Sequence, residues 1–324
     1  MTKVSVCVPV YGVEKYIGRC ARALFEQTMK EDIEFIFVDD CTKDRSMEVL
    51  EEVLTEYPER VGQVKIIHHP QNQGLTGARN TALKAASGEY IIHCDSDDWV
   101  DWELYGSMYE AAKQNGADVV CCGIIVEKGG GKQKKITGDN IGNVEEFFEK
   151  TFNSICFNSV WNKMFSREIA LAEDIIAPGH ITMGEDLLRT SQMLLKCRKM
   201  VMCDDVCYHY FCGNAGAVTL NFKRKAFDSS VEALGILIEK FPEEYAPYAE
   251  ACKGQNLFSA LRVAEMSRKE FMTMYDRETR KKVVSNRHLS GIKRMILGIS
   301  LLSYHLARFC CRILTFIARV MSIK

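Results

Sequence analysis

The stretch Val4-Ser5-Val6-Cys7-Val8-Pro9-Val10, followed by Tyr11 and Gly12, decides how this chain of 324 residues folds. It is a short run of apolar and mostly β-branched residues that ends at turn-forming residues. Such a run predicts a fully buried strand rather than a helix. Strands that are apolar on both faces are typical of parallel sheets, which are covered by helices on both sides.

Similar apolar runs recur along the first hundred residues, with segments of helical spacing between them. Further strands are expected at 35–38, 64–68 and 90–94, and helices at 16–29, 46–57 and 76–86. Strands that alternate with helices predict right-handed βαβ units. The fold class expected is therefore α/β, with a Rossmann-like, mostly parallel sheet and helices on both faces.

The pattern changes along the rest of the chain. Helices are expected at 106–115, 144–152 and 186–197, strands at 118–126 and 206–211, and a hairpin or loop at Gly129-Gly130-Gly131. Beyond residue 222 almost every segment has helical spacing. The sequence thus predicts an α/β domain over residues 1–220 and a helical C-terminal region over residues 221–324.

Composition excludes several classes of protein. The chain is 47% hydrophobic and 26% charged, with a net charge of −1, which indicates neither a disordered nor a nucleic-acid-binding protein. Fourteen cysteines lie mostly in apolar runs, and no signal peptide precedes Val4, so we expect reduced thiols and a cytoplasmic location. The cluster Cys203, Cys207, His209 and Cys212 lacks the spacing of a zinc knuckle and is better explained as core thiols.

Acidic clusters follow two of the predicted strands. Asp39 and Asp40 come after the second strand, and Asp95 and Asp97 come after the fourth. Each cluster alone could be a helix cap. Two carboxylates two residues apart at a strand end, however, can point at one hard cation such as Mg2+ or Mn2+, whose other ligands would be waters and phosphate oxygens.

Four motifs in order resemble those of glycosyltransferase family 2. They are Val4 to Tyr11, Phe37 to Asp44, Asn72 to Asn80 and Gly88 to Asp98. The resemblance is close over about residues 1–125 and looser up to Thr219. It implies a GT-A fold, a nucleotide-sugar donor with UDP as the default, a divalent metal and an inverting, hexosyltransferase-type reaction in polysaccharide or glycolipid synthesis. Residues 1–125 would bind the nucleotide sugar, and residues 126–220 would form the acceptor side.

The resemblance also implies roles for residues that match the donor motifs. Pro9 and Tyr11 would flank the nucleotide base, and Asp40, with Asp39 beside it, would accept a hydrogen bond from the base. Arg79 would approach the base or the diphosphate, since a guanidinium can fork onto phosphate oxygens.

The metal and the base follow from two further matches. Asp95 resembles the ribose-side member of the acidic motif, and Asp97 resembles the direct metal ligand. Glu185 and Asp186 resemble the acidic pair of the family, with Asp186 as the base that takes the acceptor proton. Their position also suits a plain helix N-terminus, so both roles stay open for this pair.

Two weaker matches complete the expected site. Trp161 could stack on a sugar or pack in the core, and Lys163 could meet a phosphate or the acidic pair. His209 lies where relatives carry a residue close to the diphosphate and metal, but the arginine expected shortly afterwards is missing. His209 could equally be an ordinary strand residue.

The C-terminal tail is basic, with no Asp or Glu from Thr279 to the end. Taken as one helix, residues 291–322 carry a narrow polar stripe formed by Gly291, Arg294, Gly298, His305, Arg308, Arg312, Thr315, Arg319 and Ser322. The apolar stretch is too short to cross a bilayer. Two partners fit equally: an anionic membrane surface, or a protein surface on the catalytic domain or on a second copy in a homodimer.

The sequence therefore favours a cytoplasmic glycosyltransferase that acts on a glycan or lipid-linked acceptor, at the inner face of the cell membrane. A sugar-1-phosphate nucleotidyltransferase is the first alternative, but it would need a glycine-rich basic loop after the first strand. A non-catalytic carbohydrate-binding relative is the second. The set of Asp40, Arg79, Asp95, Asp97 and Asp186 is complete, which argues against a decayed site.

Overall fold

A computed structural model describes residues 1–128, 131–136, 143–151, 158–175, 177–214, 223–263 and 265–323. The chain divides into two compact units, Met1–Glu146 with Asn158–Ala217 and Phe147–Phe157 with Val218–Lys324. Residue 220, the predicted domain boundary, and Thr219, where the family resemblance was expected to end, lie outside the described residues. The predicted division into domains therefore stays a prediction.

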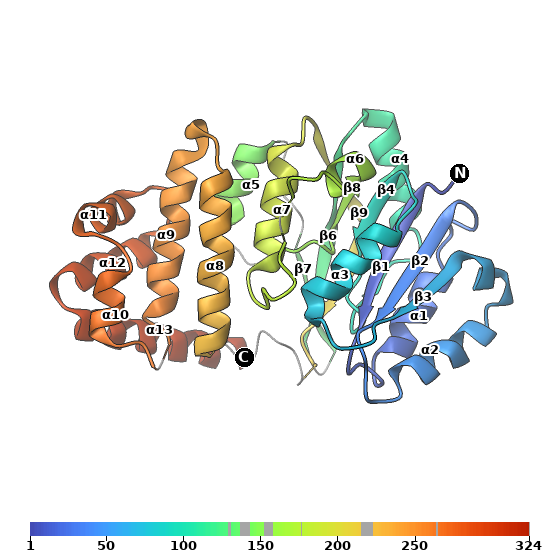
Figure 1. The fold of residues 1–324 in the computed structure, drawn as a ribbon, viewed down its shortest axis with the longest axis horizontal. Coiled ribbons are helices and arrows are strands. Elements are labelled where there is room, and N and C mark those ends of the chain that lie inside the picture. Colours follow the sequence, from blue (N-terminus) through green and yellow to red (C-terminus); the bar gives the residue numbers. More distant parts are fainter. Residues whose placement is uncertain are drawn as a thin grey trace. The chain divides into compact units, whose positions relative to one another are not determined.

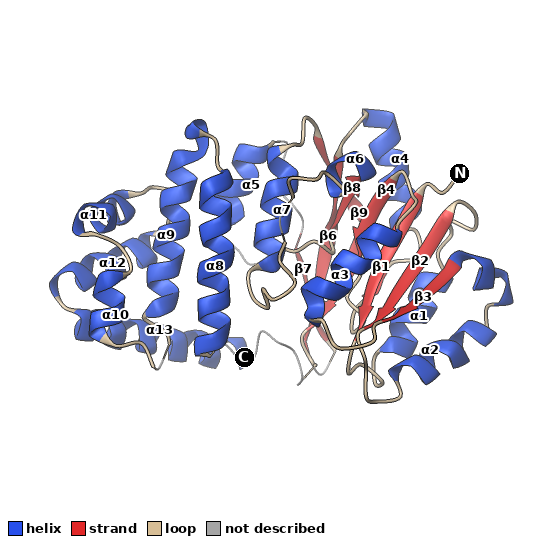
Figure 2. Cartoon of the chain, in the orientation of Figure 1, coloured by secondary structure: helices blue, strands red, loops and turns tan. Residues whose placement is uncertain are grey.

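The first unit is built on one mixed sheet (Figures 1 and 2). Its strands among the described residues are β1 (Val4–Val10), β2 (Ile33–Asp39), β3 (Val64–His68), β4 (Tyr90–His93), β5 (Trp99–Val100), β6 (Val119–Lys128), β7 (Lys132–Ile136), β8 (Lys163–Ser166) and β9 (Met200–Phe211). They lie in the order β3-β2-β1-β4-β8-β6-β9-β5, with β7 beside β6 as a hairpin. The first four strands are parallel to one another, and β8 joins them to the second half by antiparallel pairing.

Helices of the first unit connect these strands. They are α1 (Ile17–Phe25), α2 (Ser46–Thr55), α3 (Gly74–Ala85), α4 (Leu104–Asn115), α6 (Arg167–Ala170) and α7 (Glu185–Leu195), with a 3-10 helix at Pro58–Gln63. The chain runs outward from β1 to β3 and then back past β2 and β1 to β4. Right-handed connections therefore place α3 on the opposite face from α1 and α2, and α3 lies in front of the sheet in Figure 1. The predicted α/β fold is confirmed.

β1 creates the opening in which a ligand can sit. All seven of its residues are buried, as the apolar run predicted. Pairing with β2 continues to Val10, whereas pairing with β4 ends at Cys7. Pro9, which has no N–H to donate, therefore lies where the β4 side of the strand is unpaired. This is also the point at which the strand order reverses, where open parallel sheets bind ligands.

The second unit is helical. It contains α8 (Arg224–Lys240), α9 (Ala246–Ala260), α10 (Arg268–Thr273), α11 (Arg277–Ser285), α12 (Gly291–Leu302) and α13 (Tyr304–Ile323), with a short 3-10 turn at Glu243–Tyr245. Phe148, from α5 (Val144–Thr151), packs edge-on against Phe241 and Tyr245 of this unit. No helix in the described part of the chain is long and apolar enough to span a membrane.

The prediction of one continuous helix over residues 291–322 is wrong. α12 ends at Leu302, Ser303 is extended at φ −146° and ψ 112°, and α13 begins at Tyr304. The Tyr304 hydroxyl donates to the carbonyl oxygen of Met266 at 2.5 Å, so a tertiary contact fixes the start of α13. The side chains of Arg319 and Ser322, both members of the predicted stripe, lie outside the described set.

The buried Arg60 side chain ties the end of α1 to the chain before β3. Its guanidinium donates to the carbonyl oxygens of Phe25, Gln27, Met29 and Lys30. We expect Arg60→Met to lower the free energy of unfolding by about 3 kcal/mol, because several buried acceptors would lose their partners together. Urea titration of the purified protein measures this change.

The control is Arg45→Met, at an exposed arginine paired with Glu48. Exposed ion pairs contribute little, so this variant should lose less than about 1 kcal/mol. Equal losses in the two variants would show that Arg60 has no special structural role.

Candidate active site

Arg79 lies at the centre of the site and joins residues that are far apart in the sequence. Its side chain is 2% exposed, and Nη2 lies 2.7 Å from Oδ1 of Asp95. Nη1 donates to Oδ1 of Asp186 and lies 3.6 Å from Oε1 of Glu185. One guanidinium thus brings together three of the predicted site residues, from the donor motif and from the acidic pair.

Asp40 supports the loop that leads into α3. Its Oδ1 accepts from the backbone N–H of Gln73 at 2.7 Å, and its Oδ2 accepts from that of Gly74 at 2.8 Å. Nδ1 of His69 lies 2.8 Å from the same Oδ1. Gly74 starts α3 with φ +76°, a conformation that favours glycine. Asp40 is buried, so it positions the helix that carries Arg79.

Asp39 is the more open of the two carboxylates after β2. Its Oδ1 accepts from the backbone N–H of Thr42 at 2.8 Å, and Nδ1 of His68 lies 3.0 Å from Oδ2. Tyr11, after β1, is exposed. The hydroxyl of Thr42 also accepts from the N–H of Gly12 at 2.9 Å, which joins the loops after β1 and β2.

The acidic loop after β4 is held by β9. The backbone N–H of Asp95 donates to the Tyr208 hydroxyl at 2.9 Å, and that hydroxyl donates to Oδ2 of Asp98 at 2.8 Å. Asp98 also accepts from the backbone N–H of Phe211 at 2.7 Å. Burial raises the pKa of Asp98 well above its ordinary range. Asp98 therefore orders the loop and leaves Asp95 and Asp97 as its outward carboxylates.

The donor set at Asp95 and Asp97 suits a hard divalent cation. Oδ2 of Asp97 accepts from Nδ2 of Asn214 at 2.8 Å. Burial raises the pKa of Asp97, and the negative charge of Asp95 adds to that shift. Within the described ranges no group of three or more His, Cys, Asp or Glu residues is placed to hold a metal. A cation here would need oxygens from a bound ligand.

Glu185 and Asp186 begin α7, as the glycine before them allows. Gly184 has φ +86°, which turns the chain into the helix. Burial raises the pKa of Glu185 to about 7, and the negative charge of Asp186 adds to the shift. Burial also raises the pKa of Asp186, while the positive charge of Arg79 opposes that rise. Burial therefore favours the protonated form of both carboxyls, and Arg79 counteracts it.

The structure places Lys163 close to the acidic pair. Nζ of Lys163 donates to the carbonyl oxygen of Ser159 at 2.8 Å and to Oδ1 of Asn162 at 2.7 Å. The Lys163 charge also opposes the rise in the pKa of Asp186. The neighbouring Trp161 is buried and stacks on Tyr208, with ring centroids 4.3 Å apart, so it packs in the core.

His209 lies between two carboxylates outside the acidic motif. Nδ1 lies 2.8 Å from Oε1 of Glu127, and Nε2 lies 2.9 Å from Oδ1 of Asp101. The ring also stacks on Trp99 at a centroid distance of 5.0 Å. Both ring nitrogens are thus engaged. Metal ligation by His209 stays a prediction that these contacts do not favour.

The sequence did not predict the structural role of two residues that organise the site, Tyr208 and Arg189. Tyr208 contacts Asp95 and Asp98 from more than a hundred positions along the chain, and no local pattern signals such a contact. Arg189 of α7 is buried and donates to Oδ1 of Asn80, so it links α7 to α3. Burial lowers its pKa to about 10, and the nearby positive charge of Arg79 adds to that shift. The only sequence signal for Arg189 is its place one turn after the acidic pair.

These features define an α/β protein with an acidic cluster at the point where the strand order of its sheet reverses. The chain belongs to glycosyl transferase family 2, whose model matches residues 5–171. It is 33% identical over 217 residues to a poly(ribitol-phosphate) beta-glucosyltransferase of Bacillus spizizenii, a match that covers 64% of this chain and 32% of the relative. The chain thus spans about a third of that relative.

Solved structures share the fold. The crystal structure of S. aureus TarS 1–349 in complex with UDP-GlcNAc superposes with a TM-score of 0.65 at 18% identity, and the match covers 95% of this chain and 90% of the other. A mannosyltransferase of Pyrobaculum calidifontis in complex with GDP-Man and Mn2+ gives a TM-score of 0.56 at 15% identity, over 94% and 85% of the two chains. The predicted GT-A fold with a helical C-terminal region is confirmed.

The raised pKa of Glu185 makes stability depend on pH. The folded state holds the Glu185 proton up to about pH 7, whereas the carboxyl loses it near its ordinary value of 4.5 when the chain unfolds. The folded state binds more protons between these values, so the free energy of unfolding falls as the pH rises through this window.

Glu185→Gln should reduce this fall in the free energy of unfolding, as urea titrations at both ends of the pH window would measure. Glu48→Gln, at an exposed position, serves as the control. A wild-type pH slope in Glu185→Gln would contradict the assignment.

Proposed function

We propose that this protein transfers a sugar, with inversion, from a UDP-sugar to a hydroxyl of a glycan or lipid-linked acceptor in cell-surface polysaccharide or glycolipid synthesis. The observation that carries the proposal is the double contact of Arg79 with Asp95 and Asp186. This contact holds Asp95 beside Asp186, which supports a donor-binding carboxylate next to the carboxylate that would activate the acceptor. In an inverting transfer the acceptor hydroxyl attacks one side of the reacting carbon while the diphosphate leaves from the other, so the groups that assist each must be in place together.

The donor would lie across the carboxyl ends of β1, β2 and β4. Tyr11, beside Pro9, would contact the base, and Asp95 would contact the ribose. The hydrogen bond from the base, expected at Asp40, would go to the neighbouring Asp39, because Asp40 is buried and already accepts from two backbone N–H groups. The exposed ring of Tyr11 and the partly open carboxylate of Asp39 support this orientation. The UDP-GlcNAc complex of the TarS structure supports UDP as the nucleotide.

Asp97, together with Asp95, would hold a Mg2+ or Mn2+ ion against the donor diphosphate. The cation supplies charge neutralisation for the leaving diphosphate. Asn214 would orient Asp97 through its side-chain hydrogen bond. Since two carboxylates leave room for phosphate oxygens in an octahedral shell, the metal would arrive with the donor. The Mn2+ complex of the archaeal mannosyltransferase agrees with this assignment.

Asp186 would act as the base, with Glu185 as its neighbour. The Arg79 guanidinium orients Asp186, and its positive charge opposes the rise in the pKa of Asp186 and so favours the carboxylate form that a base requires. Arg79 would thereby serve both substrates. The poly(ribitol-phosphate) acceptor named for the Bacillus relative supports a polyol or glycan hydroxyl as the acceptor. We place the enzyme in the cytoplasm, at the inner face of the membrane where such acceptors are assembled.

Asp97→Asn tests the metal assignment. The variant should lose Mn2+-stimulated hydrolysis of UDP-sugars by at least about a hundredfold, because the amide cannot carry the negative charge that binds the cation. Asp228→Asn, at an exposed carboxylate of α8, is the matched control and should keep the wild-type rate. Wild-type hydrolysis by a folded Asp97→Asn protein would remove the metal proposal.

Asp186→Asn tests the base. Donor affinity, measured by calorimetry with UDP-sugar and Mn2+, should stay within a few-fold of wild type. Transfer should fall by roughly a hundredfold or more, because no group takes the acceptor proton. Equal losses of donor affinity and transfer would assign Asp186 to donor binding instead.

Synthesis of a UDP-sugar from UTP and a sugar phosphate would favour the nucleotidyltransferase alternative.

A further inference from the structure

Among the described residues, α13 presents an exposed apolar face. Its large hydrophobic side chains are 43% to 60% exposed, and they are Leu306, Phe309, Ile313 and Ile317. Steps of three and four residues place these four on one side of the helix. Water-exposed apolar rows of this length mark contact surfaces in proteins.

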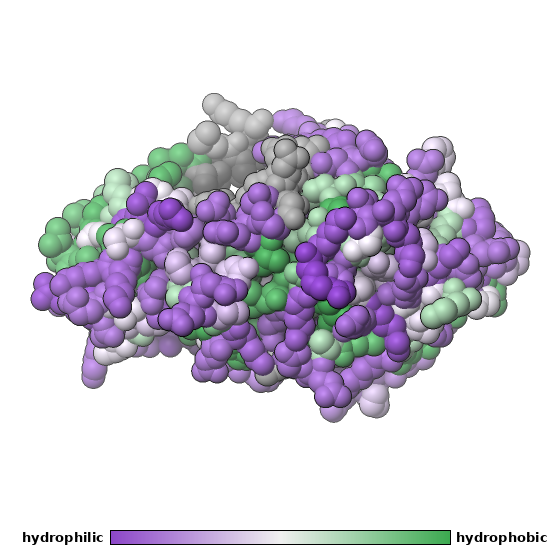
Figure 3. Space-filling view, turned by 90° about the horizontal axis from the view of Figure 1, so that it is seen from above, coloured by the Kyte–Doolittle hydropathy of each residue, from purple (hydrophilic) through white to green (hydrophobic). Residues whose placement is uncertain are grey.

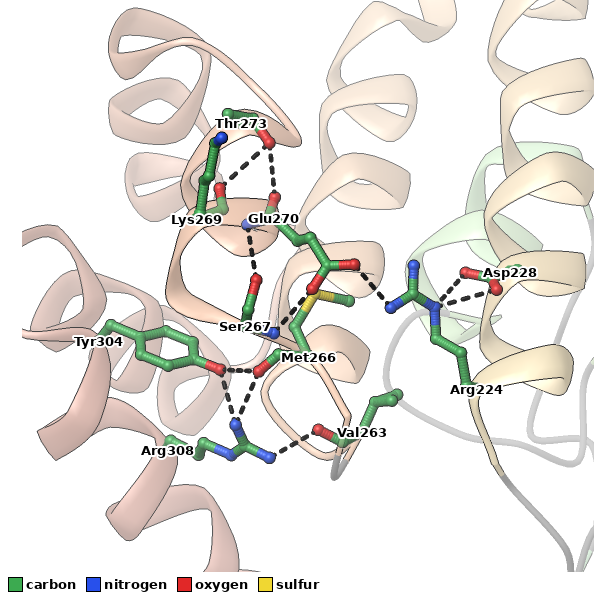
Figure 4. A network of polar contacts seen from close by, with 10 residues as sticks. All are labelled: Arg224, Asp228, Val263, Met266, Ser267, Lys269, Glu270, Thr273, Tyr304 and Arg308. Carbon is green, nitrogen blue, oxygen red and sulfur yellow. Dashed lines mark hydrogen bonds and ion pairs between the residues drawn. The ribbon is translucent and has the colours of Figure 1, made fainter.

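The rotation of α13 about its own axis is fixed by Arg308 (Figure 4). Its guanidinium donates to the carbonyl oxygens of Val263 and Met266, each at 2.8 Å, and to the Tyr304 hydroxyl at 2.8 Å. Tyr304, Ala307 and Cys311 are buried on the inward side of the helix. Arg308 is therefore part of the packing of the second unit and does not belong to an outward polar stripe.

The preceding helix adds to the same kind of surface. Ile292 and Met295 of α12 are more than half exposed. In Figure 3 hydrophobic side chains gather at the left end of the view, where the helices of the second unit lie. We call Leu306, Phe309, Ile313 and Ile317 the α13 face.

The charged side chain that borders the α13 face is basic. Arg312 is exposed and lies along one edge of the face by helical position. The sequence has no Asp or Glu after Glu278. A second copy of this helix would offer Arg312 no carboxylate, whereas an anionic surface would pair with it. The complementary partner is thus both apolar and anionic.

We propose that the α13 face binds the surface of a bilayer that contains anionic lipid. The helix lies in the plane of the interface, with Leu306 and Phe309 among the acyl chains and Arg312 at the phosphates. It does not cross, since no helix in the described residues is long and apolar enough to do so. The inference is independent of the sugar-transfer proposal, because binding to vesicles needs neither donor nor acceptor.

Vesicle sedimentation of the full-length protein tests the inference. Protein should sediment with vesicles of phosphatidylcholine and phosphatidylglycerol, and less with phosphatidylcholine alone. The double variant Leu306→Ser/Phe309→Ser should bind at least about tenfold more weakly, because it removes two apolar side chains from the interface. UDP-sugar hydrolysis and the unfolding midpoint should stay near wild type, since both side chains are exposed. Val61→Ser, at an exposed valine of the first unit, should bind as wild type does.

Two arginines one turn apart provide a sharper comparison. Arg312→Gln should weaken binding to anionic vesicles by about fivefold and leave stability unchanged. Arg308→Gln should lower the unfolding temperature instead, because it removes the contacts to Val263 and Met266. Unchanged sedimentation of the double variant would overturn the proposal. A second outcome would also overturn it. In that outcome the wild type does not bind vesicles and forms a dimer, seen by light scattering, that the double variant does not form.

Discussion

The ion-pair cluster around Arg79 is the interaction on which the site depends. A buried guanidinium must be paired, since an isolated charge away from water is very costly. Here the partners are Asp95, Glu185 and Asp186, carboxylates that would repel one another without it. The position of Arg79 thus fixes the distance between Asp95, after β4, and the acidic pair of α7, and with it the geometry that we propose for sugar transfer.

Residues from both halves of the sheet hold this cluster in place. Asp40 fixes the start of α3 through two backbone N–H groups, and Tyr208 fixes the acidic loop from β9. Trp161 stacks on Tyr208 and so stiffens this support. The two halves of the first unit are therefore coupled through polar contacts at the edge of the sheet where the ligand is expected.

Local patterns predicted the elements that depend on local physics. The bounds of β1 and β3 were predicted as the structure has them. β1 is a buried parallel strand and therefore a continuous apolar run, whereas β3 is a half-exposed edge strand. The members of the cluster were named from the family resemblance, and among them Asp95 also follows a predicted strand. Contacts between distant segments were not predictable: His209 is engaged by Glu127 and Asp101, and Arg308 turns inward because Val263 and Met266 offer carbonyl oxygens.

The most direct test of the central claim, that Asp186 serves an inverting transfer beside the donor diphosphate, needs no knowledge of the acceptor. Water can replace the acceptor, and proton NMR can follow the anomeric signal of the sugar released from an α-linked UDP-sugar with Mn2+. An inverting transfer should release the β anomer first, and the α anomer should grow only as the sugar equilibrates. Initial release of the α anomer would contradict inversion.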